Sequence, residues 1–138
     1  MADKKILIVD DDPDVRHGMH VRLKANHYDT FFAADGLSAM AEARKQQPDL
    51  IILDLGLPAG DGFVVMERLK KMESLALIPI IVVSARDVRA NQERAMKAGA
   101  QAFLQKPVDN AELLAVIRQA LGESPQREQP AVYDLGSV

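Results

Sequence analysis

Four short apolar stretches of the chain each lead into a residue whose side chain can do chemistry. In chain order these residues are the neighbours Asp10 and Asp11, then Asp54, Ser84 and Lys106. Carboxylates, a hydroxyl and an ammonium group in one place form a set that can bind a hard cation and the oxygens of a phosphoryl group. They form a single site only if the stretches before them end side by side.

The charges of these residues predict what the site would bind. Carboxylates gathered at one place repel each other, so a site with Asp10, Asp11 and Asp54 requires a counter-charge. Mg²⁺ suits it better than Ca²⁺, because one or two carboxylates and a carbonyl leave room for water and phosphate oxygens in octahedral geometry. Lys106 adds a compact positive charge, and the Ser84 hydroxyl can hydrogen-bond a phosphoryl oxygen. These groups surround one remaining carboxylate, so Asp54 is predicted to be the nucleophile.

The apolar stretches are predicted to be strands of one parallel sheet. Ile6–Val9, Leu50–Leu53 and Ile78–Val83 are apolar throughout, which is typical of strands buried on both faces. Two further strands are expected at Asp29–Ala33 and Ala102–Gln105. Ligands of open α/β sheets bind at the carboxyl ends of the strands, so the residues that follow the strands should converge there.

Segments of helical periodicity alternate with these strands. Pro13 is placed to open the first helix, with Asp12 as its N-cap. Asp109 and Glu112 have the spacing of a capping box at the start of the last helix. The other helices are expected after residue 36, at 63–72 and at 87–98, and the segment 87–98 has so few apolar residues that it should pack loosely. Five strand–helix units imply a three-layer sandwich with right-handed crossovers.

Composition narrows the class of protein. A chain of 138 residues with 48% hydrophobic residues fits one domain with a substantial core. Its formal net charge of −3 argues against direct binding of nucleic acid. It has no cysteine, which excludes a disulfide framework and a thiolate nucleophile. With neither a signal-peptide core nor an apolar run of membrane-spanning length, we expect a cytoplasmic protein without membrane contact.

The character of the chain changes near its end. Residues 1–121 are expected to form the domain. Residues 122–138 are largely polar at first and contain two prolines, so they are expected to be a flexible tail or linker.

Several short motifs, in their order and spacing, resemble the receiver domains of two-component response regulators. A single such motif is weak evidence, but the full set in the right order is specific. The resemblance covers about Lys4 to Leu121 and implies a flavodoxin-like α/β fold, a doubly wound parallel sheet of five strands in the order 2-1-3-4-5 with five helices. The matching segments are Ile8–Pro13, Leu53–Pro58, Asp61-Gly62, Val82–Ala85, Gly99-Ala100 and Lys106-Pro107.

The resemblance implies how the acidic residues act. Asp54 would accept a phosphoryl group from a phosphohistidine, carried by a sensor histidine kinase or a histidine phosphotransfer protein. Asp11, Asp54 and the backbone carbonyl of Gly56 would bind Mg²⁺ directly, and Asp10 would hold it largely through water. Such a domain is not an enzyme on other molecules, because it catalyses only its own phosphorylation and dephosphorylation.

The resemblance also implies how the signal leaves the site. Lys106 would pair with the phosphoryl group, and its peptide bond to Pro107 would be cis. Ser84 and Phe103 would form a switch pair, in which the hydroxyl moves toward the phosphoryl group and the ring turns inward. The surface of the last two helices would then change its affinity for a downstream protein, and phosphorylation-dependent homodimers are compatible with this.

Other interpretations of the same residues stay open. Asp10 and Asp11 could simply cap the first helix, and Phe103 could be an ordinary core residue. A phosphatase with an Asp nucleophile usually has a second Asp two residues later, where this chain has Gly56. A flavin-binding module needs a phosphate-binding loop after the first strand, which is absent. The main alternative is a protein-interaction module of the same fold that works without phosphorylation.

Overall fold

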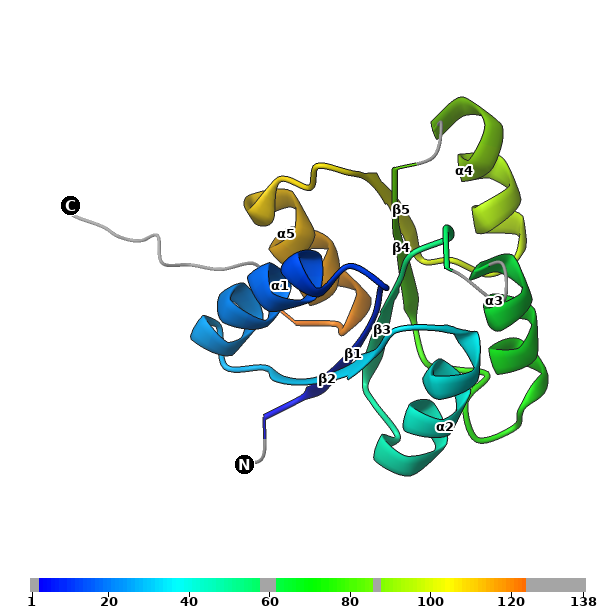
Figure 1. The fold of residues 1–138 in the computed structure, drawn as a ribbon, viewed down its shortest axis with the longest axis horizontal. Coiled ribbons are helices and arrows are strands. Elements are labelled where there is room, and N and C mark those ends of the chain that lie inside the picture. Colours follow the sequence, from blue (N-terminus) through cyan, green and yellow to red (C-terminus); the bar gives the residue numbers. More distant parts are fainter. Residues whose placement is uncertain (1–2, 58–61, 86–87, 124–138) are drawn as a thin grey trace.

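The computed structural model describes residues 3–57, 62–85 and 88–123, and strands alternate with helices throughout (Figure 1). The elements are β1 (Lys5–Val9), α1 (Pro13–Ala25), β2 (Asp29–Ala33), α2 (Gly36–Gln46), β3 (Leu50–Leu53), α3 (Gly62–Lys71), β4 (Ile80–Ser84), α4 (Val88–Lys97), β5 (Ala102–Gln105) and α5 (Asn110–Ala120).

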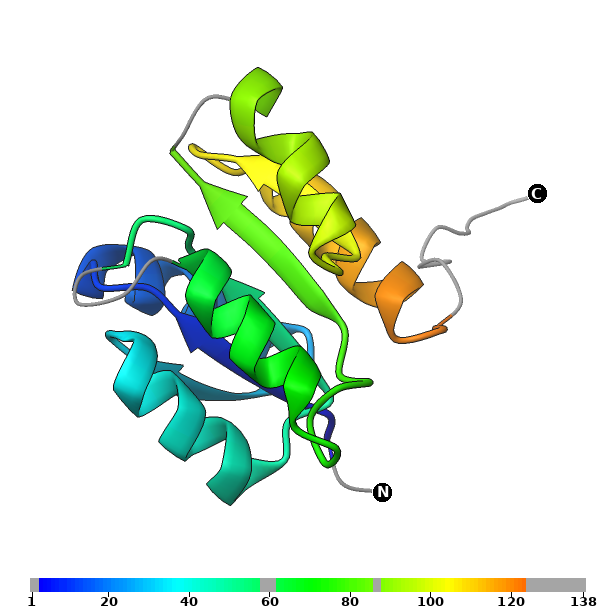
Figure 2. The ribbon, with the colours of Figure 1, turned by 90° about the vertical axis from the view of Figure 1, so that its right-hand side faces the viewer.

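The strands form one parallel sheet with the order β2-β1-β3-β4-β5, which confirms the predicted fold class. Helices α1 and α5 cover one face, and α2, α3 and α4 cover the other (Figures 1 and 2). All residues of β3 and β4 are buried because helices lie on both sides of these central strands. Because every strand pairing is parallel, the carboxyl ends of all the strands lie at the same edge of the sheet.

The sheet divides the apolar core into two clusters. Leu7 and Val9 of β1 pack on the side of α2 and α3, whereas Ile6 and Ile8 pack on the side of α1 and α5. This alternation follows from the pleat, which points successive side chains to opposite faces. A shift of one residue in the register would exchange the two sets, so the packing of both layers fixes the position of each strand end.

Strand β4 differs from the expected boundaries at both ends. It begins at Ile80 rather than Ile78, because the Ile78 N–H is already bonded to the Leu75 carbonyl and Pro79 has no N–H to donate. It ends at Ser84 rather than Val83. The predicted start was therefore wrong by two residues, and Ser84 lies within the strand.

The helix caps agree with the sequence except in one detail. Asp12 is the N-cap of α1 and accepts a hydrogen bond of 2.9 Å from the Asp14 N–H, as predicted. Asp109 is the N-cap of α5, but its side chain accepts from the Ala111 N–H, not from the Glu112 N–H that a capping box would use. Both caps satisfy N–H groups that have no partner inside the helix.

Parts of some sequence predictions lie outside the described residues. These are Pro58 and Asp61 of the matched motifs, Asp87 at the expected start of α4, and residues 124–138 of the expected tail. Gly122 and Glu123 are described, and their N–H groups bond to the carbonyls of Gln119 and Arg118. Within the described ranges, no helix has the length and apolar character required to cross a membrane.

Candidate functional site

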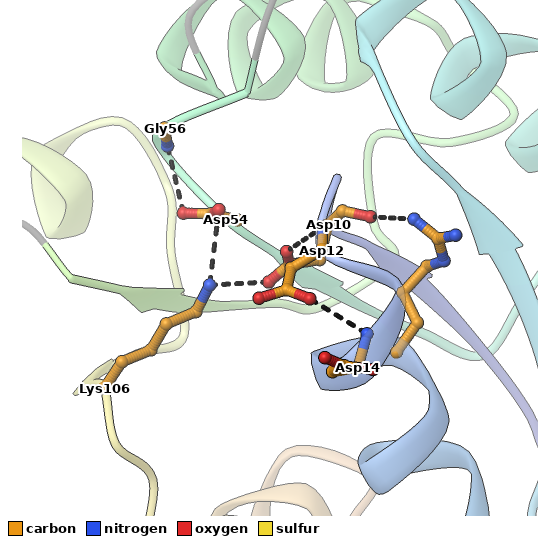
Figure 3. Close-up of polar contacts among 7 residues, drawn as sticks. Asp10, Asp12, Asp14, Asp54, Gly56 and Lys106 are labelled. Atoms are coloured by element: carbon orange, nitrogen blue, oxygen red, sulfur yellow. Dashed lines mark hydrogen bonds and ion pairs between the residues drawn. The ribbon is translucent and has the colours of Figure 1, made fainter.

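The register of β1 and β3 brings the first carboxylates together. Val9 pairs with Leu53, so Asp10 and Asp54, which follow these residues, lie level with each other. The Asp54 N–H continues the ladder by bonding to the Val9 carbonyl at 2.9 Å. Both carboxylates lie at the carboxyl edge, with side chains directed toward one another (Figure 3).

Strands β4 and β5 bring the hydroxyl and the lysine to the same edge. Ser84 pairs with Gln105, and the N–H of the next residue, Lys106, bonds to the Ser84 carbonyl at 2.9 Å. The peptide bond between Lys106 and Pro107 is cis, as the family resemblance implied. The Lys106 side chain extends back across the sheet edge toward the carboxylates (Figure 3).

Lys106 contacts two of the three carboxylates. Its Nζ lies 2.7 Å from Asp10 Oδ2 and 3.4 Å from Asp54 Oδ2. Burial of Lys106 acts to lower its pKa, but the hydrogen bond and charge of Asp10, together with the charge of Asp54, outweigh it and raise the pKa. Lys106 therefore carries its positive charge firmly at neutral pH.

The acidic cluster carries more negative charge than Lys106 can balance. Ligand oxygens of Asp10, Asp11 and Asp54 all lie within 4.8 Å of one another. Asp10 is 2% exposed and Asp54 7%, whereas Asp11 faces solvent. Across the described parts of the chain, Lys106 is the only cation within 4 Å of the Asp10 and Asp54 carboxylates. An all-oxygen set with excess negative charge and an open side fits a hard divalent cation.

The backbone after Asp54 holds its carboxylate in place. The Gly56 N–H donates a hydrogen bond of 3.0 Å to Asp54 Oδ1 (Figure 3). A Cβ at position 56 would lie 3.6 Å from the same oxygen, which is an ordinary contact. A side chain at this position would therefore stand beside the carboxylate, and glycine leaves that approach open.

Gly62 lets the first turn of α3 approach the backbone of the site. A Cβ there would lie 2.6 Å from Leu55 Cα and 2.7 Å from the Asp54 carbonyl oxygen. The Gly62 N–H also bonds to the Leu55 carbonyl at 3.0 Å. No side chain fits without moving this backbone, so glycine here is a requirement of the close approach.

Ser84 and Phe103 share one face of the sheet. Phe103 pairs with Val82, and Ser84 lies two residues after Val82, so all three side chains point toward α3 and α4. Ser84 is fully buried, and Phe103 is half-buried against the core cluster on that side. The shared face is consistent with a switch pair, and their movement stays a prediction.

Sequence reasoning missed the contacts that hold the end of β1. Arg16 Nη1 donates a hydrogen bond of 2.8 Å to the Asp10 carbonyl. The Asp10 carboxylate accepts one of 2.9 Å from the Asp12 N–H, in the turn just before α1, whose N-cap is Asp12 itself. The alternative that Asp10 caps the helix is therefore wrong, because Asp12 is the N-cap, while Asp10 stabilises the turn before it and contacts Lys106. The only sequence signal for Arg16 was its place in the first turns of the helix after Asp10.

The chain was compared with known protein families and with curated proteins. The profile of the response regulator receiver domain matches residues 6–118. The DNA-binding dual master transcriptional regulator RpaA of Synechocystis is 39% identical over 94% of this chain, which spans 54% of that protein. The polar-differentiation response regulator DivK of Brucella ovis is 32% identical over 88% of this chain, which spans 98% of it. The chain thus corresponds to about half of some relatives and to nearly all of another.

Solved structures show the same fold. A CheY-like response regulator receiver domain protein from Methanospirillum hungatei has a TM-score of 0.81 and 28% identity, covering 88% of this chain and 95% of its own. The receiver domain of a sensor histidine kinase from Pseudomonas aeruginosa has a TM-score of 0.81 and 30% identity, covering 88% of this chain and 100% of its own. The latter contains a magnesium ion coordinated in its active-site cleft.

Proposed function

The chain belongs to the response regulator receiver domain family, and we propose that Asp54 is the residue on which this domain accepts a phosphoryl group. The observation that carries the assignment is the convergence at one sheet edge of Asp54, Asp10, Asp11 and Lys106, from three different strands and the turns after them. Asp10 is already paired closely with Lys106 at 2.7 Å, whereas Asp54, at the end of the central strand β3, lies 3.4 Å from Lys106 and has its Oδ1 held by the Gly56 N–H.

The proposed reaction is an in-line transfer from a phosphohistidine. An Asp54 carboxylate oxygen forms the new bond to phosphorus, the phosphorus–nitrogen bond breaks, and the imidazole keeps the electron pair and takes up a proton. Lys106, poised between Asp10 and Asp54, neutralises charge on the transferred oxygens. Water later hydrolyses the acyl phosphate, so the domain catalyses only its own phosphorylation and dephosphorylation.

Mg²⁺ is the proposed cofactor. Asp11, Asp54 and the Gly56 carbonyl would bind it directly, and Asp10 would hold it largely through water. When bound, it neutralises the carboxylates and the phosphoryl oxygens. The acidic cluster of this chain and the magnesium ion in the Pseudomonas receiver domain support the assignment.

The proposed donor is a sensor histidine kinase or a histidine phosphotransfer protein, and the proposed output is a partner-binding surface. Ser84 would move toward the phosphoryl group while Phe103 turns inward, which changes the face formed by α4, β5 and α5. A downstream protein or a second copy of the chain would respond to that change. In this proposal the domain comprises residues 1–121, residues 122–138 form a tail or linker, and the protein works in the cytoplasm without direct contact to nucleic acid or membrane.

The test is intact-mass spectrometry after incubation with acetyl phosphate, with and without Mg²⁺. The parent should gain one phosphoryl group only with Mg²⁺, and Asp54→Asn should gain none. Asp29→Asn is the matched control, because Asp29 lies at the opposite edge of the sheet, and this variant should react like the parent. Acyl phosphates are labile, so binding of beryllofluoride is measured in parallel.

Failure of both measurements would favour the second candidate function. If the parent neither gains mass nor binds beryllofluoride, the domain is a protein-interaction module that works without phosphorylation. The tight pairing of Lys106 with Asp10 at 2.7 Å is the observation that favours this candidate, because it gives the lysine a structural role of its own.

A further inference from the structure

Helix α4 is packed less completely than its neighbour α3. Ala95 is the one buried residue of α4, as its thin apolar content predicted. Helix α3 instead buries Gly62, Phe63, Val65, Met66 and Leu69. The two helices lie side by side on one face of the sheet (Figure 2). The side chains of the two helices do not fill the space between them.

A groove of about 410 Å³ remains between α3 and α4. Phe63, Val64 and Ala98 give it apolar surface, while Lys70, Lys71 and Arg94 give it positive charge. Among the described residues of the lining, Glu67 is the only acidic one, and it lies 3.6 Å from Lys71 in an i,i+4 pair. Two of the three cations are left without a carboxylate from the described residues of the groove.

Arg94 forms the α4 side of this groove. Its guanidinium carbon lies 3.7 Å from the centre of the Phe63 ring, a cation–π contact that joins α4 to α3. Within the part of the chain that the structure describes, no carboxylate lies within 4 Å of this guanidinium. Its fork of N–H donors is therefore able to take a carboxylate while its plane stays on the ring.

Lys70 forms the α3 side. Its stem lies against Gly99, where a Cβ would stand 2.8 Å from Lys70 Cε, and Gly99 also has a φ of +108°. Its Nζ donates to the Ala76 carbonyl at 3.3 Å. Burial lowers the pKa of Lys70, because its charge is partly removed from water without a described carboxylate to offset this. An anion beside Lys70 would relieve that cost.

We propose that the groove between α3 and α4 is a docking site for an acidic amphipathic helix of a partner protein. Carboxylates of the helix contact Arg94 and Lys70, and its apolar side chains lie over Val64 and Ala98. We infer an acidic amphipathic helix from charge complementarity, because cationic side chains surround the apolar surface of the groove. The groove lies on the α3 side of α4, away from β5 and α5. Binding of the helix there does not depend on phosphorylation of Asp54.

The experiment uses the full, unphosphorylated chain and a defined probe. The probe is a synthetic helical peptide with Glu and Leu at i,i+3 and i,i+4 spacing, and the control peptide has Lys in place of Glu. Amide chemical shifts of the ¹⁵N-labelled protein report the site and the affinity. The acidic peptide should shift the amides of Val64, Lys70, Arg94 and Ala98, and the Lys peptide should not.

Two charge variants of α4 test specificity. Arg94→Glu should weaken binding about tenfold or more, while Lys97→Glu should change it less than about twofold, although both alter net charge equally. Lys97 is a suitable control because it is exposed, pairs with Glu93 and does not line the groove. Lys70→Gln is a second groove variant should Arg94→Glu fail to fold.

The proposal is overturned if the acidic peptide does not bind, shifts amides elsewhere, or loses equal affinity through Lys97→Glu, since the last result means general charge attraction. Because these measurements need no phosphoryl group, they are independent of the test on Asp54. Either proposal can therefore fail alone.

Discussion

Charged and polar side chains gather at both edges of the parallel sheet. At the carboxyl edge, three carboxylates gather, and Lys106 contacts two of them. At the amino edge, the Tyr28 hydroxyl donates a hydrogen bond of 2.7 Å to Glu123, and Lys4 lies 3.7 Å from the same carboxylate. The carboxyl edge thus has an excess of negative charge, whereas in this cluster of the amino edge Lys4 and Arg118, which lies beside Tyr28, balance the single carboxylate of Glu123.

Other polar residues of the amino edge also have partners. Asp49 accepts a hydrogen bond of 2.8 Å from the Lys5 N–H, and the Lys5 ammonium donates to the Gln46 carbonyl at 2.9 Å. Lys24 lies 3.5 Å from Asp29. These contacts join the strand starts to one another and to the ends of α1 and α2, so their role is structural.

The charge balance of the two edges indicates that the carboxyl edge binds a ligand and that the amino edge stabilises the fold. Buried like charges destabilise a fold unless a ligand neutralises them, so an unbalanced cluster marks a place where the protein binds something. A balanced cluster requires no ligand. Substitutions at the two edges should therefore differ in size and in their response to Mg²⁺.

The largest effect is expected for Lys106→Ala measured without Mg²⁺. The change leaves Asp10 and Asp54 buried without their cation, and breaking such a pair costs about 3 kcal/mol in the free energy of unfolding. Mg²⁺ should restore part of the loss. Urea unfolding with EDTA and with Mg²⁺ measures both values.

Lys4→Ala is the control at the amino edge. Its side chain is 43% exposed, so the loss should not exceed about 1 kcal/mol and should be unaffected by Mg²⁺. Equal losses for the two lysines would contradict the distinction between the edges.

Gly62→Ala should have the next largest effect. The added Cβ meets the backbone of Leu55 and Asp54, and overpacking of this kind costs about 2 kcal/mol. It should also slow phosphorylation by acetyl phosphate, because Asp54 is displaced. Gly18→Ala is the control, since nothing lies within 4 Å of its Cβ and alanine favours the helix. A Gly62→Ala protein with parental stability and reactivity would refute the close approach.

Tyr28→Phe should cost less, about 1 kcal/mol, because it removes one hydrogen bond and leaves Glu123 with Lys4 and solvent. Phosphorylation should be unchanged. A double-mutant cycle with Glu123→Gln measures the interaction in urea unfolding, and additive effects would mean that the Tyr28–Glu123 bond contributes nothing.

Alkaline pH should weaken both edges by the smallest amounts. Burial lowers the pKa of Lys106, but Asp10 and Asp54 outweigh burial, so the pKa is raised. The contribution of Lys106 to stability is therefore complete below pH 10.5 and is lost as the pH rises through the raised pKa. Burial first, and then Glu123, raises the pKa of Tyr28, so its contribution is complete below pH 10.0 and is lost above it. Unfolding of the parent and of Tyr28→Phe from about pH 8 upward should show a smaller alkaline loss in the variant. An equal loss of stability in the two proteins would mean that ionisation of Tyr28 does not cause the alkaline loss.

The functional edge of the molecule was predictable because its residues follow strands directly in the sequence. Apolar runs before Asp10, Asp54, Ser84 and Lys106 indicate buried parallel strands, and parallel strands place all their carboxyl ends at one edge. The caps at Asp12 and Asp109 and the loose packing of α4 were predictable for the same reason, since periodicity and capping act within a few residues.

Tertiary structure alone decided which distant side chains meet. Tyr28 and Glu123 are 95 positions apart, and nothing near either residue indicates the other. Arg94 contacts Phe63 only because the helices pack side by side on the sheet. Lys106 lies closer to Asp10 than to Asp54 only because the strands are in this register. Local patterns determine each element, whereas pairs between elements depend on the packing of the whole core, which no short stretch of sequence encodes.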